Sequence, residues 1–161
     1  MKNIKFFILG LILLFISLTY TNEIALYRIT PSLLLPWVVY ISIHLEYRVC
    51  LSYSFFFSIA NELLNPQLLG FTSILYVLLS HFTNRYHSSF NKDKYTTIVF
   101  SLFVINVIFY LIHWVYFSFT NEQPWYLFQK SMITVIYSTL VSCLIIFLIF
   151  LVDKLKIVFH D

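Results

Sequence analysis

Glu62 is the residue best suited to do chemistry, because it is an acid inside an otherwise apolar run. An ionisable group within a membrane segment is costly and needs a partner or a water-filled cavity. Ser54, Ser58 and Glu62 recur at four-residue steps, which places them on one face of a helix. Two interpretations stay open. This face is a polar seam that leads to a binding or contact site, or Glu62 reaches water beside the Asn65-Pro66 turn and ends the helix.

Three further sets of polar side chains recur at helical spacing. Small and hydroxyl residues at such spacing let membrane helices approach one another and hydrogen-bond across the contact. Helix packing is therefore the favoured interpretation, and a proton relay through the second set is the alternative. The sets are Ser73, Tyr76 and Ser80; Asn106, Tyr110 and His113; and Thr134, Ser138 and Ser142.

The motifs of common catalytic and metal sites are missing from the sequence. There is no glycine-rich phosphate loop, no HExxH and no GxSxG, and Gly10 and Gly70 are too few to build a nucleotide cradle. The histidines are too scattered for a metal site, and the charges are too dispersed for a nucleic-acid footprint. We therefore predict that the chain is not an enzyme, holds no metal or cofactor, and binds no nucleic acid.

The elements that position these residues follow from the composition. Of 161 residues, 60% are hydrophobic and only 11% are charged. A water-soluble domain has about 25% charged residues, which cover its core. The composition excludes such a domain and predicts that residues 1–161 form a single transmembrane domain of the all-α class, embedded in the lipid bilayer.

Breaks in the apolar pattern divide the chain into six candidate membrane spans. A span needs about 20 residues to cross about 30 Å of hydrocarbon. Three spans share residues 31–83, so either the bilayer is thinned there or one helix enters only partway, and Pro31 and Pro36 permit a kink. The spans are Phe6–Tyr20, Ser32–Ile43, Val49–Leu64, Gln67–Thr83, Thr96–Phe119 and Lys130–Val152.

The distribution of lysine and arginine predicts the orientation. With a cytoplasmic amino terminus, eight cations lie inside and only Arg28 and Lys130 lie outside, in accord with the positive-inside rule. Both termini are then cytoplasmic, which agrees with an even number of spans. Trp37, Trp114 and Trp125 fall near the outer ends of their spans, where we expect them to anchor at the interface. The inner cations are Lys2, Lys5, Arg48, Arg85, Lys92, Lys94, Lys154 and Lys156.

Residues 29–82 resemble the rod shape-determining protein MreD family. In that family a proline-initiated, leucine-rich helix precedes a helix that ends in an acid and two apolar residues, followed by a turn with an apolar-Gly step and another helix. The corresponding elements are Pro31-Ser32-Leu33-Leu34-Leu35, then Glu62-Leu63-Leu64, and then Leu69-Gly70. The six spans and short loops are also similar to the family.

This resemblance implies a multi-pass, non-enzymatic subunit of the bacterial inner membrane that takes part in cell shape and lateral peptidoglycan synthesis. It implies association with an MreC-like protein, and joint action with the MreB filament, the RodA glycosyltransferase and its transpeptidase. The family's bundle is similar to the substrate-binding subunits of energy-coupling-factor vitamin importers. Such an importer subunit is the alternative function, a lipid-modifying enzyme has the least support, and a homodimer stays open.

The predicted partner contact is the outer turn that carries the family motif. Its residues are Asn61, Glu62, Asn65, Pro66 and Gly70. Gly70 is expected to let a neighbouring backbone approach the start of the fourth span, because glycine has no side chain.

Overall fold

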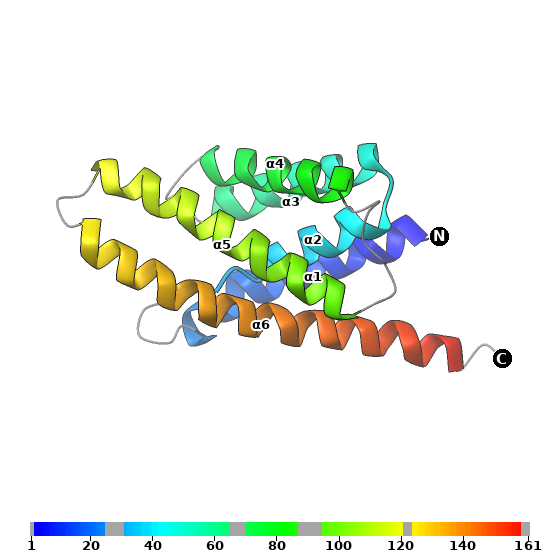
Figure 1. Cartoon of the computed structure of the whole chain (residues 1–161). Helices are drawn as coiled ribbons and strands as arrows, with labels where there is room; N and C mark the ends of the chain where they lie inside the picture. Colours follow the sequence, from blue (N-terminus) through cyan, green and yellow to red (C-terminus); the bar gives the residue numbers. More distant parts are fainter. Residues whose placement is uncertain (1, 25–30, 65–69, 87–94, 121–123, 159–161) are drawn as a thin grey trace.

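The computed structural model describes residues 2–24, 31–64, 70–86, 95–120 and 124–158, and these residues contain helices and no strands (Figure 1). The prediction of an all-α chain is confirmed. The helices are α1 (Lys2–Ile24), α2 (Leu34–His44), α3 (Tyr47–Leu64), α4 (Phe71–Tyr86), α5 (Tyr95–Thr120) and α6 (Pro124–Val158).

Each predicted span overlaps one of these helices, with differences at the ends. α6 begins at Pro124 rather than near Lys130, as suits a residue whose fixed φ and missing N–H are tolerated at a first helical position. α4 begins at Phe71, and the earlier start predicted at residues 67–69 lies outside the described residues. The hydropathy pattern predicted where helices occur better than where they begin.

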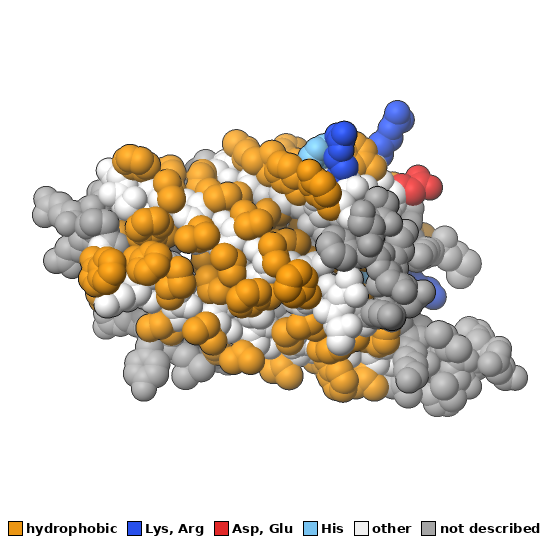
Figure 2. Space-filling model, viewed as in Figure 1, with side chains coloured by type: hydrophobic (Ala, Val, Ile, Leu, Met, Phe, Trp, Pro, Cys, Tyr) orange, Lys and Arg blue, Asp and Glu red, His pale blue; other side chains and the backbone are white. Residues whose placement is uncertain are grey.

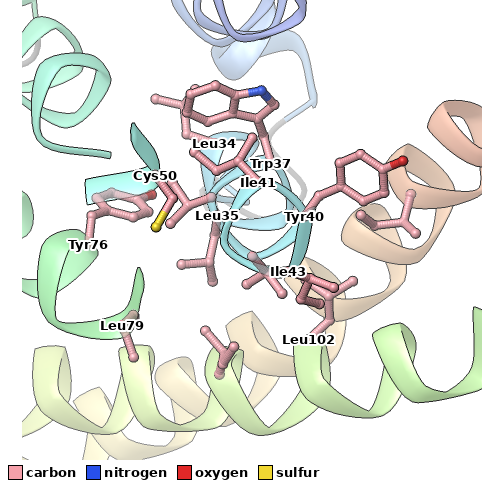
Figure 3. Close-up of a cluster of buried hydrophobic side chains, with 14 of the residues drawn as sticks. Leu34, Leu35, Trp37, Tyr40, Ile41, Ile43, Cys50, Tyr76, Leu79 and Leu102 are labelled. Atoms are coloured by element: carbon pink, nitrogen blue, oxygen red, sulfur yellow. The ribbon is translucent and has the colours of Figure 1, made fainter. Parts of the chain in front are cut away.

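Two hairpins flank the short helix α2. α3 packs along α4, α5 packs along α6, and α2 contacts all five other helices, while α1 lies against α2 and α3 (Figure 1). α2 thus occupies the centre of the bundle. Its residues Leu34 to Ile43 are all buried, and their side chains radiate in every direction towards the neighbouring helices (Figure 3).

The sequence of α2 is apolar on every side, as expected of a helix with no solvent-facing stripe. Its 11 residues give a length of about 16 Å, about half of the hydrocarbon thickness of a bilayer. Pro36 does not interrupt α2, which runs as one helix from Leu34 to His44. Pro36 lies in the first turn, where backbone N–H groups have no partner within the helix, so its missing N–H breaks no helical hydrogen bond.

Trp37 is a core residue, and the prediction that it anchors at an interface is wrong. Its side chain is fully buried, its Nε1 donates to the Phe6 carbonyl at 3.2 Å, and its ring lies 4.6 Å from that of Phe57. Gly10 of α1 makes room for both rings: a Cβ atom there would lie 2.6 Å from Trp37 Cζ2 and 2.8 Å from Phe57 Cζ. The missing side chain at residue 10 therefore lets α1 pack directly on these two rings.

Polar side chains from other helices hold both ends of α2. Near its amino end, the Ser32 hydroxyl lies 2.5 Å from the Tyr76 hydroxyl, and the Ser32 N–H donates to the Tyr110 hydroxyl at 3.3 Å. At the carboxyl end, Asn84 Nδ2 donates to the carbonyls of Ser42 at 2.7 Å and Leu45 at 3.1 Å. The last carbonyls of a helix lack partners within the helix, and water cannot supply them in the interior. Asn84 supplies the missing donor.

We expect Asn84→Ala to lower the free energy of unfolding by about 1–3 kcal/mol, the cost of leaving buried acceptors without a donor. Asn84→Asp should lower it at least as much, because a carboxylate cannot donate to these carbonyls. Denaturation of the purified chain in detergent micelles measures both. Thr83→Ala is the matched control, since Thr83 Oγ1 donates only within its own helix, to the Leu79 carbonyl. Equal stability of the Asn84 and Thr83 variants would contradict this role.

The exterior of the bundle is apolar. Large hydrophobic side chains cover the helices, and charged side chains in the same view gather towards one end (Figure 2). Among the described residues, two stretches are long and apolar enough to cross a membrane: Tyr95–Phe119 and Trp125–Leu151. Only 28% and 33% of their most apolar windows are buried, unlike a core helix of a water-soluble protein. Shorter apolar helical stretches are Ile4–Tyr20 and Leu34–His44.

Candidate functional site

Glu62 joins the end of α3 to the start of α4. Its Oε2 accepts hydrogen bonds from the Gly70 N–H at 2.9 Å and the Ser73 hydroxyl at 2.5 Å, and its Oε1 accepts one from the Ser73 N–H at 2.7 Å. Gly70 precedes α4 and Ser73 lies in its first turn, so these N–H groups have no acceptor within the helix. A carboxylate at a helix amino terminus also interacts favourably with the helix dipole. Glu62 therefore caps α4 from a different helix.

This geometry differs from the interpretation that Glu62 reaches water and ends the helix. Its side chain is only 5% exposed, so it does not end α3 by reaching water. The polar groups around it are donors from the chain itself, so its oxygens are already engaged. Ser54 and Ser58 are also buried on α3, but Ser58 donates to the Ser54 carbonyl within the same helix. The carboxylate acts as an internal support of the turn.

Gly70 is required for a reason other than the one expected. A Cβ atom at this position would meet no atom of the described residues within 4 Å, so none of their backbone approaches it closely, and that prediction is wrong. Its φ is +87°, in the left-handed region that disfavours residues with a side chain. The glycine lets the chain turn so that its N–H points at Glu62.

The other motif residues have different surroundings. Asn61 is half-buried, and its Oδ1 has no hydrogen-bond partner among the described residues. Leu63, which precedes the turn, is 67% exposed. Asn65 and Pro66 lie outside the described residues. The described part of the motif thus has an inward-facing carboxylate and outward-facing positions at Leu63 and Gly70.

Aromatic rings line the α5 side of this turn. Phe71, which follows Gly70, has its ring centroid 5.3 Å from that of His113 and 4.5 Å from that of Tyr116. His113 also lies 4.4 Å from Phe109, whose carbonyl is 3.1 Å from His113 Nδ1. Half-buried Phe71 and partly exposed Tyr116 therefore place aromatic rings at the start of α4, next to Gly70.

The three sets of polar side chains at helical spacing connect different helices. Few of their hydrogen bonds join two members of the same set. Ser138 Oγ donates to Asn106 Oδ1 at 3.0 Å, which connects α6 to α5. The Ser80 and Ser42 hydroxyls lie 2.8 Å apart, which connects α4 to α2. Ser138 also hydrogen-bonds to the Tyr110 side chain, so Asn106 and Tyr110 share it as a partner. His113 Nδ1 instead lies against the Phe109 carbonyl, and no hydrogen bond among the described residues joins His113 to Tyr110. Thr134 bonds within its own helix, and the buried Oγ atoms of Ser54 and Ser142 have no hydrogen-bond partner in the part of the chain that the structure describes.

The sequence analysis did not identify three residues that hydrogen-bond α2 and its ends to other helices: Ser32, Ser42 and Asn84. Ser32 stands next to a proline at the start of an apolar run, and Ser42 lies within that run. Asn84 falls in a polar stretch at the end of α4, which is also typical of a connecting loop. The available signal was Ser42 itself, a hydroxyl within an apolar helix, because such groups are usually bonded.

Among the described residues, no three His, Cys, Asp or Glu side chains lie close enough together to bind a metal ion. The arrangement can instead present the exposed Leu63 and the capped start of α4 to another molecule. Comparison of the chain with models of known protein families, with curated proteins and with solved structures finds no match.

Proposed function

We propose that the chain is a six-span, non-enzymatic subunit of the bacterial inner membrane that acts in cell elongation. In this proposal both termini are cytoplasmic and the α3–α4 turn lies on the outer side. There the turn binds the membrane helix or adjoining segment of an MreC-like partner. Through that partner the chain acts with the MreB filament, the RodA glycosyltransferase and its transpeptidase in lateral peptidoglycan synthesis.

The membrane location and the family are proposed on different grounds. The apolar exterior and the exposed long helices α5 and α6 suit a hydrocarbon environment. The family rests on the resemblance of residues 29–82, which include the whole of α2 and α3.

The observation that carries the partner contact is the bonding of Glu62. Its three hydrogen bonds hold Gly70 and the first turn of α4 against the end of α3, so this part of the turn is formed before any partner arrives. A preorganised surface loses less conformational entropy on binding. Glu62 is thus a positioning residue, and Leu63, Gly70 and Phe71 supply the contact surface.

Blocking this surface should weaken binding without unfolding the bundle. We expect Leu63→Trp to reduce co-purification of the MreC-like protein about tenfold, a loss of about 1.4 kcal/mol, because the larger ring prevents close contact. Leu140→Trp is the matched control, since Leu140 is 62% exposed on α6, away from the turn. Equal recovery with both variants would reject the α3–α4 turn as the contact.

The importer alternative gives a different result in the same preparation. A substrate-binding importer subunit would retain a vitamin-sized molecule and co-purify with an ATPase module. Recovery of such a molecule or of an ATPase module would contradict the proposed function and support the importer.

A further inference from the structure

The start of α3 lies beside the end of α4, at the end of this hairpin away from its turn. The Tyr47 hydroxyl lies 2.8 Å from His81 Nδ1, and the two rings are in contact, with centroids 5.5 Å apart. Asn84 Nδ2 donates to the Leu45 carbonyl at 3.1 Å. Side chains of both helices therefore meet at this end of the bundle.

Two arginines belong to this end. Arg48 follows Tyr47 directly, and Arg85 follows His81 by about one helical turn. Both side chains are exposed, and no described residue forms an ion pair with either guanidinium group. Exposed Glu46 offsets one of the two positive charges, so these three residues keep a net positive charge. A guanidinium group presents a planar set of donors that matches phosphate, so this end is suited to bind one.

An apolar surface leads along α4 to these arginines. Ile74, Leu78 and Phe82 are exposed and recur at four-residue steps, so they lie along one face of the helix. Tyr86 continues this face by one more step, and its ring stacks on that of Phe82 at 6.4 Å. Tyrosine is enriched at the level of lipid headgroups, because its ring is apolar and its hydroxyl is polar. Figure 2 shows the hydrophobic surface giving way to charged side chains towards one end.

We infer that Arg48 and Arg85 bind the phosphate of an anionic phospholipid, with an acyl chain of that lipid along Ile74, Leu78 and Phe82. A phospholipid joins a phosphate to an apolar chain in one molecule, as this surface joins exposed cations to an apolar face. Free phosphate or an acidic peptide would match the arginines alone. This inference rests on the membrane location in the proposed function and does not involve the partner.

The charge at this end favours an anionic headgroup over a zwitterionic one. Phosphatidylcholine carries an ammonium group near its phosphate, which the two guanidinium groups repel. Phosphatidylglycerol lacks that group and keeps a net negative charge, and basic residues near a membrane surface attract anionic lipid. The two lipids should therefore differ in their affinity for the chain even when their acyl chains are the same.

Native mass spectrometry of the full chain measures this difference. The chain is purified in detergent and mixed with equal amounts of dioleoylphosphatidylglycerol and dioleoylphosphatidylcholine. The test variants are Arg85→Gln and the double variant Arg48→Gln with Arg85→Gln. Lys130→Gln is the matched control for Arg85→Gln, because it also removes one exposed cation, from α6.

We expect the wild-type chain and Lys130→Gln to retain phosphatidylglycerol in about tenfold preference over phosphatidylcholine. Arg85→Gln should reduce this preference, and the double variant should retain the two lipids about equally. Retention of phosphatidylcholine should stay the same throughout, because every variant keeps the apolar face of α4.

Two results would overturn the inference and leave the membrane location standing: equal retention of the two lipids by the wild-type chain, or the same preference in Arg85→Gln and Lys130→Gln. A wild-type chain that stays dissolved without detergent and retains neither lipid would refute the proposed function together with this inference.

Discussion

Glu62→Ala is expected to lower the free energy of unfolding by about 3 kcal/mol. The substitution removes the acceptor of three hydrogen bonds, and hydrogen bonds to a charged group contribute about 1.5–3 kcal/mol each, with incomplete additivity within one cluster. It also leaves the N–H of buried Ser73 without a partner. Denaturation of the purified chain in detergent micelles measures the loss.

Two variants separate the cap from a general effect of charge. Glu62→Gln should lose a large part of the stability, because its amide group brings a donor to a site that consists of donors. Glu46→Ala should change stability by less than about 0.5 kcal/mol, since Glu46 has an exposed side chain. If Glu62→Ala and Glu46→Ala lowered the free energy of unfolding by the same amount, the cap on α4 would contribute nothing to stability.

Gly10→Ala is expected to destabilise the bundle by about 1–3 kcal/mol, the usual cost of overpacking a core. The added Cβ would lie 2.6 Å from Trp37 Cζ2, closer than carbon atoms approach one another, so either α1 or the rings of Trp37 and Phe57 must shift. Ile12→Ala is the control from the same helix, because Ile12 is 54% exposed. The same denaturation experiment compares the two variants.

A double variant tests whether contact with Trp37 is the cause. Trp37→Phe removes the part of the ring that meets residue 10, so Gly10→Ala should cost less in that background than in the wild type. Strictly additive losses would show that Gly10 matters for another reason.

The hydropathy of the chain predicted the existence and order of the helices, because long apolar runs separated by polar breaks are typical of membrane helices. It could not predict the role of α2. A helix that is apolar on all sides suits both lipid and a protein core, so the pattern does not tell a central helix from one that faces lipid. Trp37 was misassigned for this reason, since the interfacial preference of tryptophan applies only to helices that face lipid.

The candidate site was predicted in part. The cost of an embedded acid marked Glu62, but its donors follow a turn and belong to another helix, so spacing along one helix could not identify them. Gly70 was marked for close packing, whereas the packing glycine is Gly10 and Gly70 serves the turn. A glycine within the apolar run of α1 was the available signal for the packing role.

Site-specific photo-crosslinking in cells tests the central claim most directly. A photoreactive amino acid replaces Leu63, beside the Glu62-supported turn, and in a separate strain replaces Leu140 on α6; both positions are exposed. The proposed function predicts an adduct at position 63 with the mass of the chain plus its MreC-like partner, and no such adduct at position 140. No adduct at position 63, or equal adducts at both positions, would contradict a partner contact at the α3–α4 turn.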